Sequence, residues 1–85
     1  SKNKTAFSKN SSGKILSYKI TINIMVNIVD EETNKNLLNK TFVNSQVYKV
    51  QDQYSDTIII ENKTIETLIE QTYEALLIQI SEIFL

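Results

Sequence analysis

Eighty-five residues with a net charge of −1 and 41 % hydrophobic side chains describe one small folded domain, with no basic field to attract nucleic acid and no disordered composition. Cysteine and histidine are both absent, which excludes disulfides, the usual zinc sites, thiol nucleophiles and imidazole acid–base catalysis. We therefore expect a protein that is not an enzyme and that holds no metal or cofactor.

The first thirteen residues predict a short strand followed by a turn. Thr5-Ala6-Phe7 is suited to the end of a strand. The stretch Lys9 to Gly13, KNSSG, contains the small and hydrogen-bonding residues that are typical of chain reversals. A hairpin into the next strand is expected.

The segment from Lys14 to Asp30 predicts one long strand, because its side chains alternate between apolar and polar with a period of two. Such a strand has one dry face and one wet face. Its length exceeds that of the usual strand, so a bend or bulge is expected, before Tyr18. The dry face contains Tyr18, Ile20, Ile22, Ile24, Val26 and Ile28, and the wet face contains Lys19, Thr21, Asn23, Met25 and Asn27.

The charged stretch Asp30 to Asn36 predicts a reversal, and the stretch Leu38 to Gln51 predicts an antiparallel return strand. Both faces of this strand carry some apolar surface. Val43 and Val47 lie on one face, and Phe42, Tyr48 and Val50 lie on the other.

The C-terminal third predicts an amphipathic helix of about 25 residues, because the apolar spacing changes to three and four from about Ile59. Ser55-Asp56-Thr57 offers three residue types that cap helix N-termini. The predicted fold class is α+β: an antiparallel sheet, made of a hairpin of long strands plus a short N-terminal strand, is packed by this long C-terminal helix. The predicted sheet-facing stripe contains Ile65, Leu68, Ile69, Thr72, Tyr73, Leu76, Ile80 and Ile83.

The apolar surface of this unit is small for 85 ordered residues, since the entropy of ordering the chain exceeds what about a dozen buried side chains contribute. The sequence also begins at Ser1 without an initiator Met. We expect residues 1–85 to be a single α+β domain that forms part of a larger one, with its first strand and first helix upstream. A dimer or a partner is the alternative way to complete the core.

Several groups of acidic and aromatic residues are expected to have structural roles only. Glu66, Glu70 and Glu74 are expected on a solvated helix face, and Asp30, Glu31 and Glu32 in a polar turn without the ligand spacing of a calcium loop. The four tyrosines are expected to pack in the core with their hydroxyls at its rim. The lysines Lys2, Lys4, Lys9 and Lys14 concentrate positive charge around the first turn, either as a solvated group or as a contact for an anion or a lipid phosphate.

The order of these elements, with Ser17-Tyr18-Lys19-Ile20-Thr21-Ile22 opening the long strand, QVYKVQDQYSD closing the return strand and IETLIEQTYEALLIQISEIFL forming the helix, resembles the C-terminal part of the LptE family of LPS-assembly lipoproteins. The resemblance implies a small sandwich of a four-stranded sheet and two helices. It also implies a protein at the periplasmic side of the outer membrane, attached only through an upstream lipid anchor. Its implied role is that of plug and assembly partner of the LptD barrel in LPS export.

The resemblance assigns a few residues. Phe7-Ser8-Lys9-Asn10 matches the turn in which the family places a basic residue after an aromatic one, so Lys9 is the expected contact for an LPS phosphate. Glu70 and Glu74 flank Tyr73 where some members carry basic residues, which argues against LPS binding by the helix. The wet strand face, with Lys19, Thr21, Asn23 and Asn27, is expected to line the polar barrel interior.

Two other functions remain open from the sequence. One is a self-associating periplasmic adaptor or structural domain unrelated to LPS, which would form a symmetric dimer. The other is a carrier of a small ligand or lipid, which needs a cavity between helix and sheet, although the branched isoleucines favour a filled core.

Overall fold

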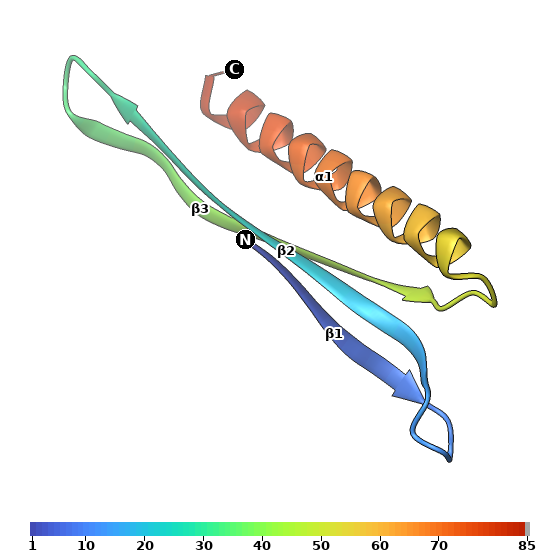
Figure 1. Cartoon of the computed structure of the whole chain (residues 1–85). Coiled ribbons are helices and arrows are strands. Elements are labelled where there is room, and N and C mark those ends of the chain that lie inside the picture. Colours follow the sequence, from blue (N-terminus) through green and yellow to red (C-terminus); the bar gives the residue numbers. More distant parts are fainter. Residues whose placement is uncertain (85) are drawn as a thin grey trace.

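The computed structural model describes residues 1–84, which form a three-stranded antiparallel sheet and one helix (Figure 1). The strands are β1 (Lys2–Lys9), β2 (Ile15–Asp30) and β3 (Lys35–Lys49), and the sheet order is β1-β2-β3. The helix α1 (Tyr54–Phe84) follows β3 and packs on one face of the sheet. The α+β fold class predicted from the sequence is confirmed.

The long hairpin of β2 and β3 has the register that the hydrophobic pattern requires. Tyr18 lies opposite Tyr48, and Ile28 lies opposite Leu38. The reversal is tightened by the Asp30 carboxylate, which accepts a hydrogen bond from the Glu32 amide at 2.9 Å. Asn34 adopts the left-handed conformation with φ of 59°, which asparagine tolerates better than most residues. This turn lets β3 begin at Lys35, before the expected Leu38.

The expected irregularity near the start of β2 lies in its pairing with β1. Ala6 pairs with Tyr18 and Ser8 pairs with Ser17, so Phe7 is the extra residue of a bulge. The following turn is held by the Asn10 side-chain carbonyl, which accepts hydrogen bonds from the Ser12 amide, the Ser12 hydroxyl and the Lys14 amide.

The dry face of β2 forms the floor of the core, as the alternation predicts. Ile20 and Ile22 are buried there. Directly opposed residues of antiparallel strands share a face, so β3 contributes Phe42 and Tyr48 to the same side. The helix closes this small core with Leu68, which is fully buried.

The helix begins at Tyr54, five residues before the expected Ile59, and contains 31 residues. The carbonyl of Gln53 accepts hydrogen bonds from the amides of Asp56 and Thr57, so Gln53 caps the helix in place of the expected Ser55-Asp56-Thr57. The Thr57 hydroxyl instead accepts a hydrogen bond from the Gln51 amide at 2.8 Å. This contact fastens the connection between β3 and α1.

The sheet-facing side of α1 differs from the predicted stripe. Ile69 and Tyr73 are 49 % and 59 % exposed, whereas Thr57, Thr64 and Thr72 are buried beside Leu68. Buried hydroxyls are tolerated when they are hydrogen-bonded. Thr64 and Thr72 donate to the carbonyls four residues earlier, and Thr72 also accepts a hydrogen bond from the Asn44 amide group.

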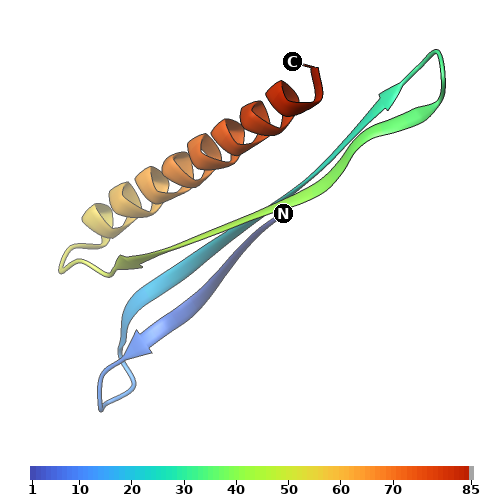
Figure 2. The same cartoon turned by 180° about the vertical axis from the view of Figure 1, so that it is seen from behind.

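The molecule is elongated, with principal extents of 59 × 19 × 16 Å and a radius of gyration of 17.6 Å. A compact domain of this length has a radius of gyration of about 12 Å. The two views agree that α1 runs beside β3, while β1 is the strand at the opposite edge of the sheet (Figures 1 and 2). The helix therefore covers β3 and part of β2, and it leaves β1 uncovered.

One polar cluster joins all four elements. The Glu61 carboxylate on α1 accepts a hydrogen bond from the Tyr48 hydroxyl at 2.5 Å and forms an ion pair with Lys4 on β1 at 2.6 Å. The rings of Tyr18 and Tyr48 stack with centroids 5.9 Å apart. The Lys4 ammonium lies 4.4 Å from the Tyr18 ring centroid, a cation–π distance.

These contacts shift three pKa values. The hydrogen bonds that Lys4 and Tyr48 give to the Glu61 carboxylate hold the pKa of that carboxyl below its ordinary value, and the same carboxylate raises the pKa of Lys4. Burial, followed by the bond to Glu61, raises the pKa of Tyr48 to about 12. The cluster is thus held together with Glu61 ionised, Lys4 charged and Tyr48 neutral.

The pH dependence of stability tests this cluster. Between the lowered pKa of Glu61 and its ordinary value of 4.5, the unfolded chain binds more protons, so the free energy of unfolding rises with pH there. Between pH 10 and about 12 the folded Tyr48 keeps a proton that the unfolded chain loses, so stability falls with rising pH. We predict a stability plateau between these windows, measured by denaturant unfolding followed by circular dichroism.

The variant Glu61→Gln is expected to flatten the acid side of this profile, and Glu74→Gln, which changes an exposed helix residue, serves as its matched control. Identical profiles for the two variants would contradict the role given to Glu61.

Candidate functional site

The face of the sheet opposite α1 is uncovered, and we call it the open face. Asn3 and Thr5 of β1 lie there, opposite Thr21 and Lys19 of β2. β3 contributes the residues that pair with these odd-numbered positions of β2. The predicted wet residues Lys19, Thr21, Asn23 and Asn27 all lie on this face, together with Asn39, Thr41, Val43, Ser45 and Val47 of β3.

The centre of the open face is polar but has little charge. Thr21 and Ser45 face each other across the strands, and their hydroxyls are 2.8 Å apart. Asn23 is partly buried and Asn27 is exposed, and each can both donate and accept hydrogen bonds. Such a surface can bind a partner through hydrogen bonds without paying the desolvation cost of burying charges.

One end of the sheet carries a hollow that the sequence did not reveal. It has a volume of about 540 Å³ and is lined by Phe7, Ser8, Leu16, Ser17, Val47, Lys49 and Val50. Phe7 is 61 % exposed beside it because the bulge leaves this residue without a strand partner. The hydroxyls of Ser8 and Ser17 are 2.6 Å apart within the lining. The hollow is open and mostly apolar, so it suits an apolar side chain or hydrocarbon segment.

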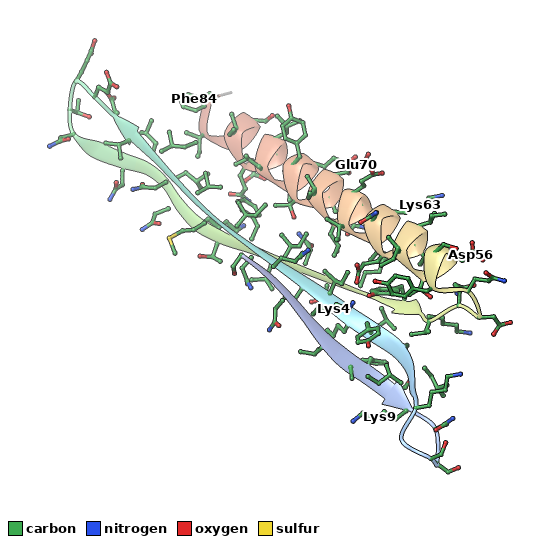
Figure 3. The ribbon with its side chains drawn as sticks, in the orientation of Figure 1. Lys4, Lys9, Asp56, Lys63, Glu70 and Phe84 are labelled. Carbon is green, nitrogen blue, oxygen red and sulfur yellow. The ribbon has the colours of Figure 1, made fainter. Side chains whose placement is uncertain are left out.

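Lys9 is the last residue of β1, and it is exposed at the end of the sheet that carries the hollow (Figure 3). It pairs with Ile15, whereas Asn27 pairs with Asn39 far along the hairpin. The structure therefore does not bring Lys9 together with Asn23 and Asn27. Its neighbours in the chain are the bulged Phe7 and the turn at Asn10.

The four lysines near the first turn do not form one group. Lys2 and Lys4 lie opposite Ile22 and Ile20, so they point to the helix side. Lys4 and Lys14 line a second hollow of about 320 Å³ that includes Tyr18, Tyr54 and Ile58. Lys9 lines neither this hollow nor the helix-side surface of β1, and it lies at the end of the strand.

The acidic residues form no metal site. Within residues 1–84, no group of three or more Asp and Glu side chains is close enough to hold a metal ion. Glu66, Glu70 and Glu74 are exposed on the helix, as the sequence predicted. Of the tyrosines, Tyr18 and Tyr48 pack in the core as expected, whereas Tyr54 and Tyr73 are exposed, contrary to the prediction.

Comparison with known proteins gives no family model, no curated protein and no solved structure that matches this chain. Among the described residues, no helix has the length and apolar character needed to span a membrane. Arguments about function therefore depend on the surfaces of the molecule.

Sequence reasoning missed Glu61 and the Phe7 hollow, which are the two features that require knowledge of register. Phe7 did carry a signal, because an aromatic residue just before a polar turn is unusual unless it is buried or binds something. Glu61 gave no comparable signal, since it is one of several glutamates on an amphipathic helix.

The exposure of Phe7 predicts that it contributes little to stability. Phe7→Ala should change the free energy of unfolding by less than about 0.5–1 kcal/mol. Leu68→Ala, which truncates a fully buried side chain, should cost about 2–5 kcal/mol. Denaturant titration of both variants measures the difference, and a large cost for Phe7→Ala would show that this ring belongs to the core.

Proposed function

We propose that this chain is a non-enzymatic LPS-assembly lipoprotein of the outer membrane, on its periplasmic side, which acts as plug and assembly partner of an LptD-like barrel. The observation that carries the proposal is the open face, a long surface of an extended sheet on which Thr, Ser and Asn side chains alternate with the exposed apolar Met25, Val43 and Val47. The resemblance of the strand and helix sequences to the LptE family supports the identity of the partner.

The elongated shape suits this role. The hairpin of β2 and β3 is the longest feature of the sheet, and its open face is continuous from Lys19 to Asn27. A barrel interior is wet and polar, so a plug must match hydrogen bonds and avoid unpaired buried charges. The Thr21 and Ser45 hydroxyls and the Asn23 and Asn27 amides meet that requirement.

The barrel partner is tested by purifying the full-length, lipidated protein from its native outer membrane and identifying stoichiometric partners by mass spectrometry. We expect an LptD-like barrel at one copy per chain. The double variant Asn23→Asp/Asn27→Asp adds two charges to the open face and should lower barrel recovery at least tenfold. Gln71→Glu, which adds a charge to an exposed helix position, is the control and should leave recovery unchanged.

Recovery of the chain without any barrel would overturn the proposal. Equal recovery of the barrel by the Asn23→Asp/Asn27→Asp variant would show that another surface binds it.

LPS is the second proposed partner, through Lys9. This residue is exposed and follows Ser8, which lines the apolar hollow, so an ammonium group and a surface for hydrocarbon lie at the same end of the sheet. A protein binds a lipid phosphate through a cationic side chain, and an exposed lysine supplies that charge as a point charge.

Lys9→Glu should reduce binding of LPS micelles at least fivefold in a fluorescence titration. Lys35→Glu makes the same charge change at the other end of the hairpin and should have no such effect. Equal losses in the two variants would show that binding depends on net charge alone and that Lys9 is not a specific contact.

A further inference from the structure

One side of α1 is an uncharged apolar surface that lies beside the line of residues facing the sheet and is only partly buried by it. Residues three, four and seven apart lie on one side of a helix. We call this side the lateral flank, and it contains Ile58, Ile65, Ile69, Leu76, Ile80 and Ile83. It lies next to the buried line of Thr57, Thr64, Leu68 and Thr72, and its members are half-buried except Ile69, which is 49 % exposed. The apolar stripe of the sequence is therefore only partly used by this molecule.

The lateral flank is directed toward β1. Ile58 lines the hollow that also contains Lys4, Tyr18 and Ile15, all of which belong to β1 or β2. Ile65 packs against the core beside Tyr18. Beside the helix there is consequently a trough whose wall is the lateral flank. Its floor is the helix-side surface of β1, formed by Lys2, Lys4 and Ala6 opposite Ile22, Ile20 and Tyr18.

The outward surface of α1 complements this floor. We call it the outer ridge, and it carries exposed apolar side chains interleaved with charged ones, one lysine and two carboxylates: Ile59, Lys63, Glu66, Glu70, Tyr73 and Leu77. The floor of the trough carries the ammonium group of Lys2 and that of Lys4, which already forms an ion pair with Glu61 of its own chain. The outer ridge of α1 is thus partly apolar and negatively charged, whereas the surface of β1 that α1 leaves uncovered is positively charged.

We propose that two copies of this chain associate through a two-fold axis that runs parallel to the helices. In this dimer the lateral flanks of the two α1 helices pack against each other. Each outer ridge lies over β1 of the other copy, so the two helices form one layer between two sheets. The interface is isologous, as expected for a two-fold dimer.

The position of α1 along the strand direction supports the pairing of outer-ridge glutamates with lysines of β1. The Glu61–Tyr48 and Thr72–Asn44 hydrogen bonds fix α1 against β3. Glu66 and Glu70 lie between those two points. The strand position opposite Lys4 also lies between them, and the position opposite Lys2 pairs with Asn44 at the second point. In a two-fold dimer with parallel helices, Glu66 and Glu70 of one copy come level with Lys4 and Lys2 of the other.

The surface area is also sufficient. The chain exposes 6411 Å². A folded monomer of 9.8 kDa is expected to expose about 5200 Å². The difference, about 1200 Å², exceeds the roughly 800 Å² that each partner buries in a standard stable interface. Both open faces remain outward in this arrangement, so the dimer does not use the surface proposed for the barrel.

The first test is the mass of the folded chain in solution. Light scattering at tens of micromolar should give about 20 kDa, twice the mass of one copy. Ile69→Glu places a charge in the lateral flank and should raise the dissociation constant at least tenfold. Met25→Glu places the same charge on the open face, at a side chain that is 77 % exposed, and should leave the dimer intact.

The second test reverses one pair of charges. Lys2→Glu and Glu70→Lys should each weaken association about threefold or more, and the double variant should recover most of the loss. A monomeric mass for the folded chain overturns the proposal, and so does a dimer that Met25→Glu dissolves or that the double charge reversal fails to restore. Because these measurements use the purified chain, their outcome is independent of whether a barrel is bound.

Discussion

The Glu61 carboxylate links the helix to both edge strands of the sheet. It accepts a hydrogen bond from the Tyr48 hydroxyl of β3 and forms an ion pair with the Lys4 ammonium of β1. The ring of Tyr18 stacks on Tyr48 and lies under the Lys4 ammonium. A helix that packs on a sheet through apolar contacts alone can rotate about its axis at modest cost, since burial is not directional. The charged and hydrogen-bonded Glu61 is directional. It fixes which side of α1 faces the sheet.

The rotation set by Glu61 explains the unusual division of surfaces. It turns a line of threonines toward the sheet and leaves Ile69, Tyr73 and Leu77 outside, although these are more apolar. The cost is limited because the buried hydroxyls are hydrogen-bonded to the helix backbone or to Asn44. A single small domain thereby presents two different surfaces, a polar open face and an apolar helix side. We assign the first to the barrel and the second to a second copy of the chain.

The sequence predicted the sheet well and the helix face poorly, for physical reasons. In β2 every second side chain is apolar, and a shift by one residue would expose all of them, so the alternation determines the buried face without further information. In α1 the apolar residues cover more than one side, and the choice among sides depends on Glu61, Asn44 and Tyr48. Those contacts join residues 13 and 28 positions apart, and local spacing does not encode them.

In the candidate site, too, the features set by strand periodicity could be predicted and those set by strand pairing could not. Lys19, Thr21, Asn23 and Asn27 lie on the open face because strand periodicity places them there. The hollow beside Phe7 could not be predicted, since it depends on two irregularities in the pairing of β1 with β2. The first, at Phe7, shifts Ser8 onto Ser17, and the second restores the original register at Lys9. Lys9 was assigned from a family resemblance, and the structure adds that it lies at the same end of the sheet as this hollow.

Photo-crosslinking from single positions in living cells tests most directly the central claim that the two faces have different partners. A crosslinking side chain at Met25 samples the open face, and one at Leu77 samples the outer ridge. The account predicts that Met25 yields an adduct with a large outer-membrane barrel and that Leu77 yields an adduct with a second copy of the chain. The absence of a second-copy adduct from Leu77, or of a barrel adduct from Met25, would contradict it, because that face would then have a different partner.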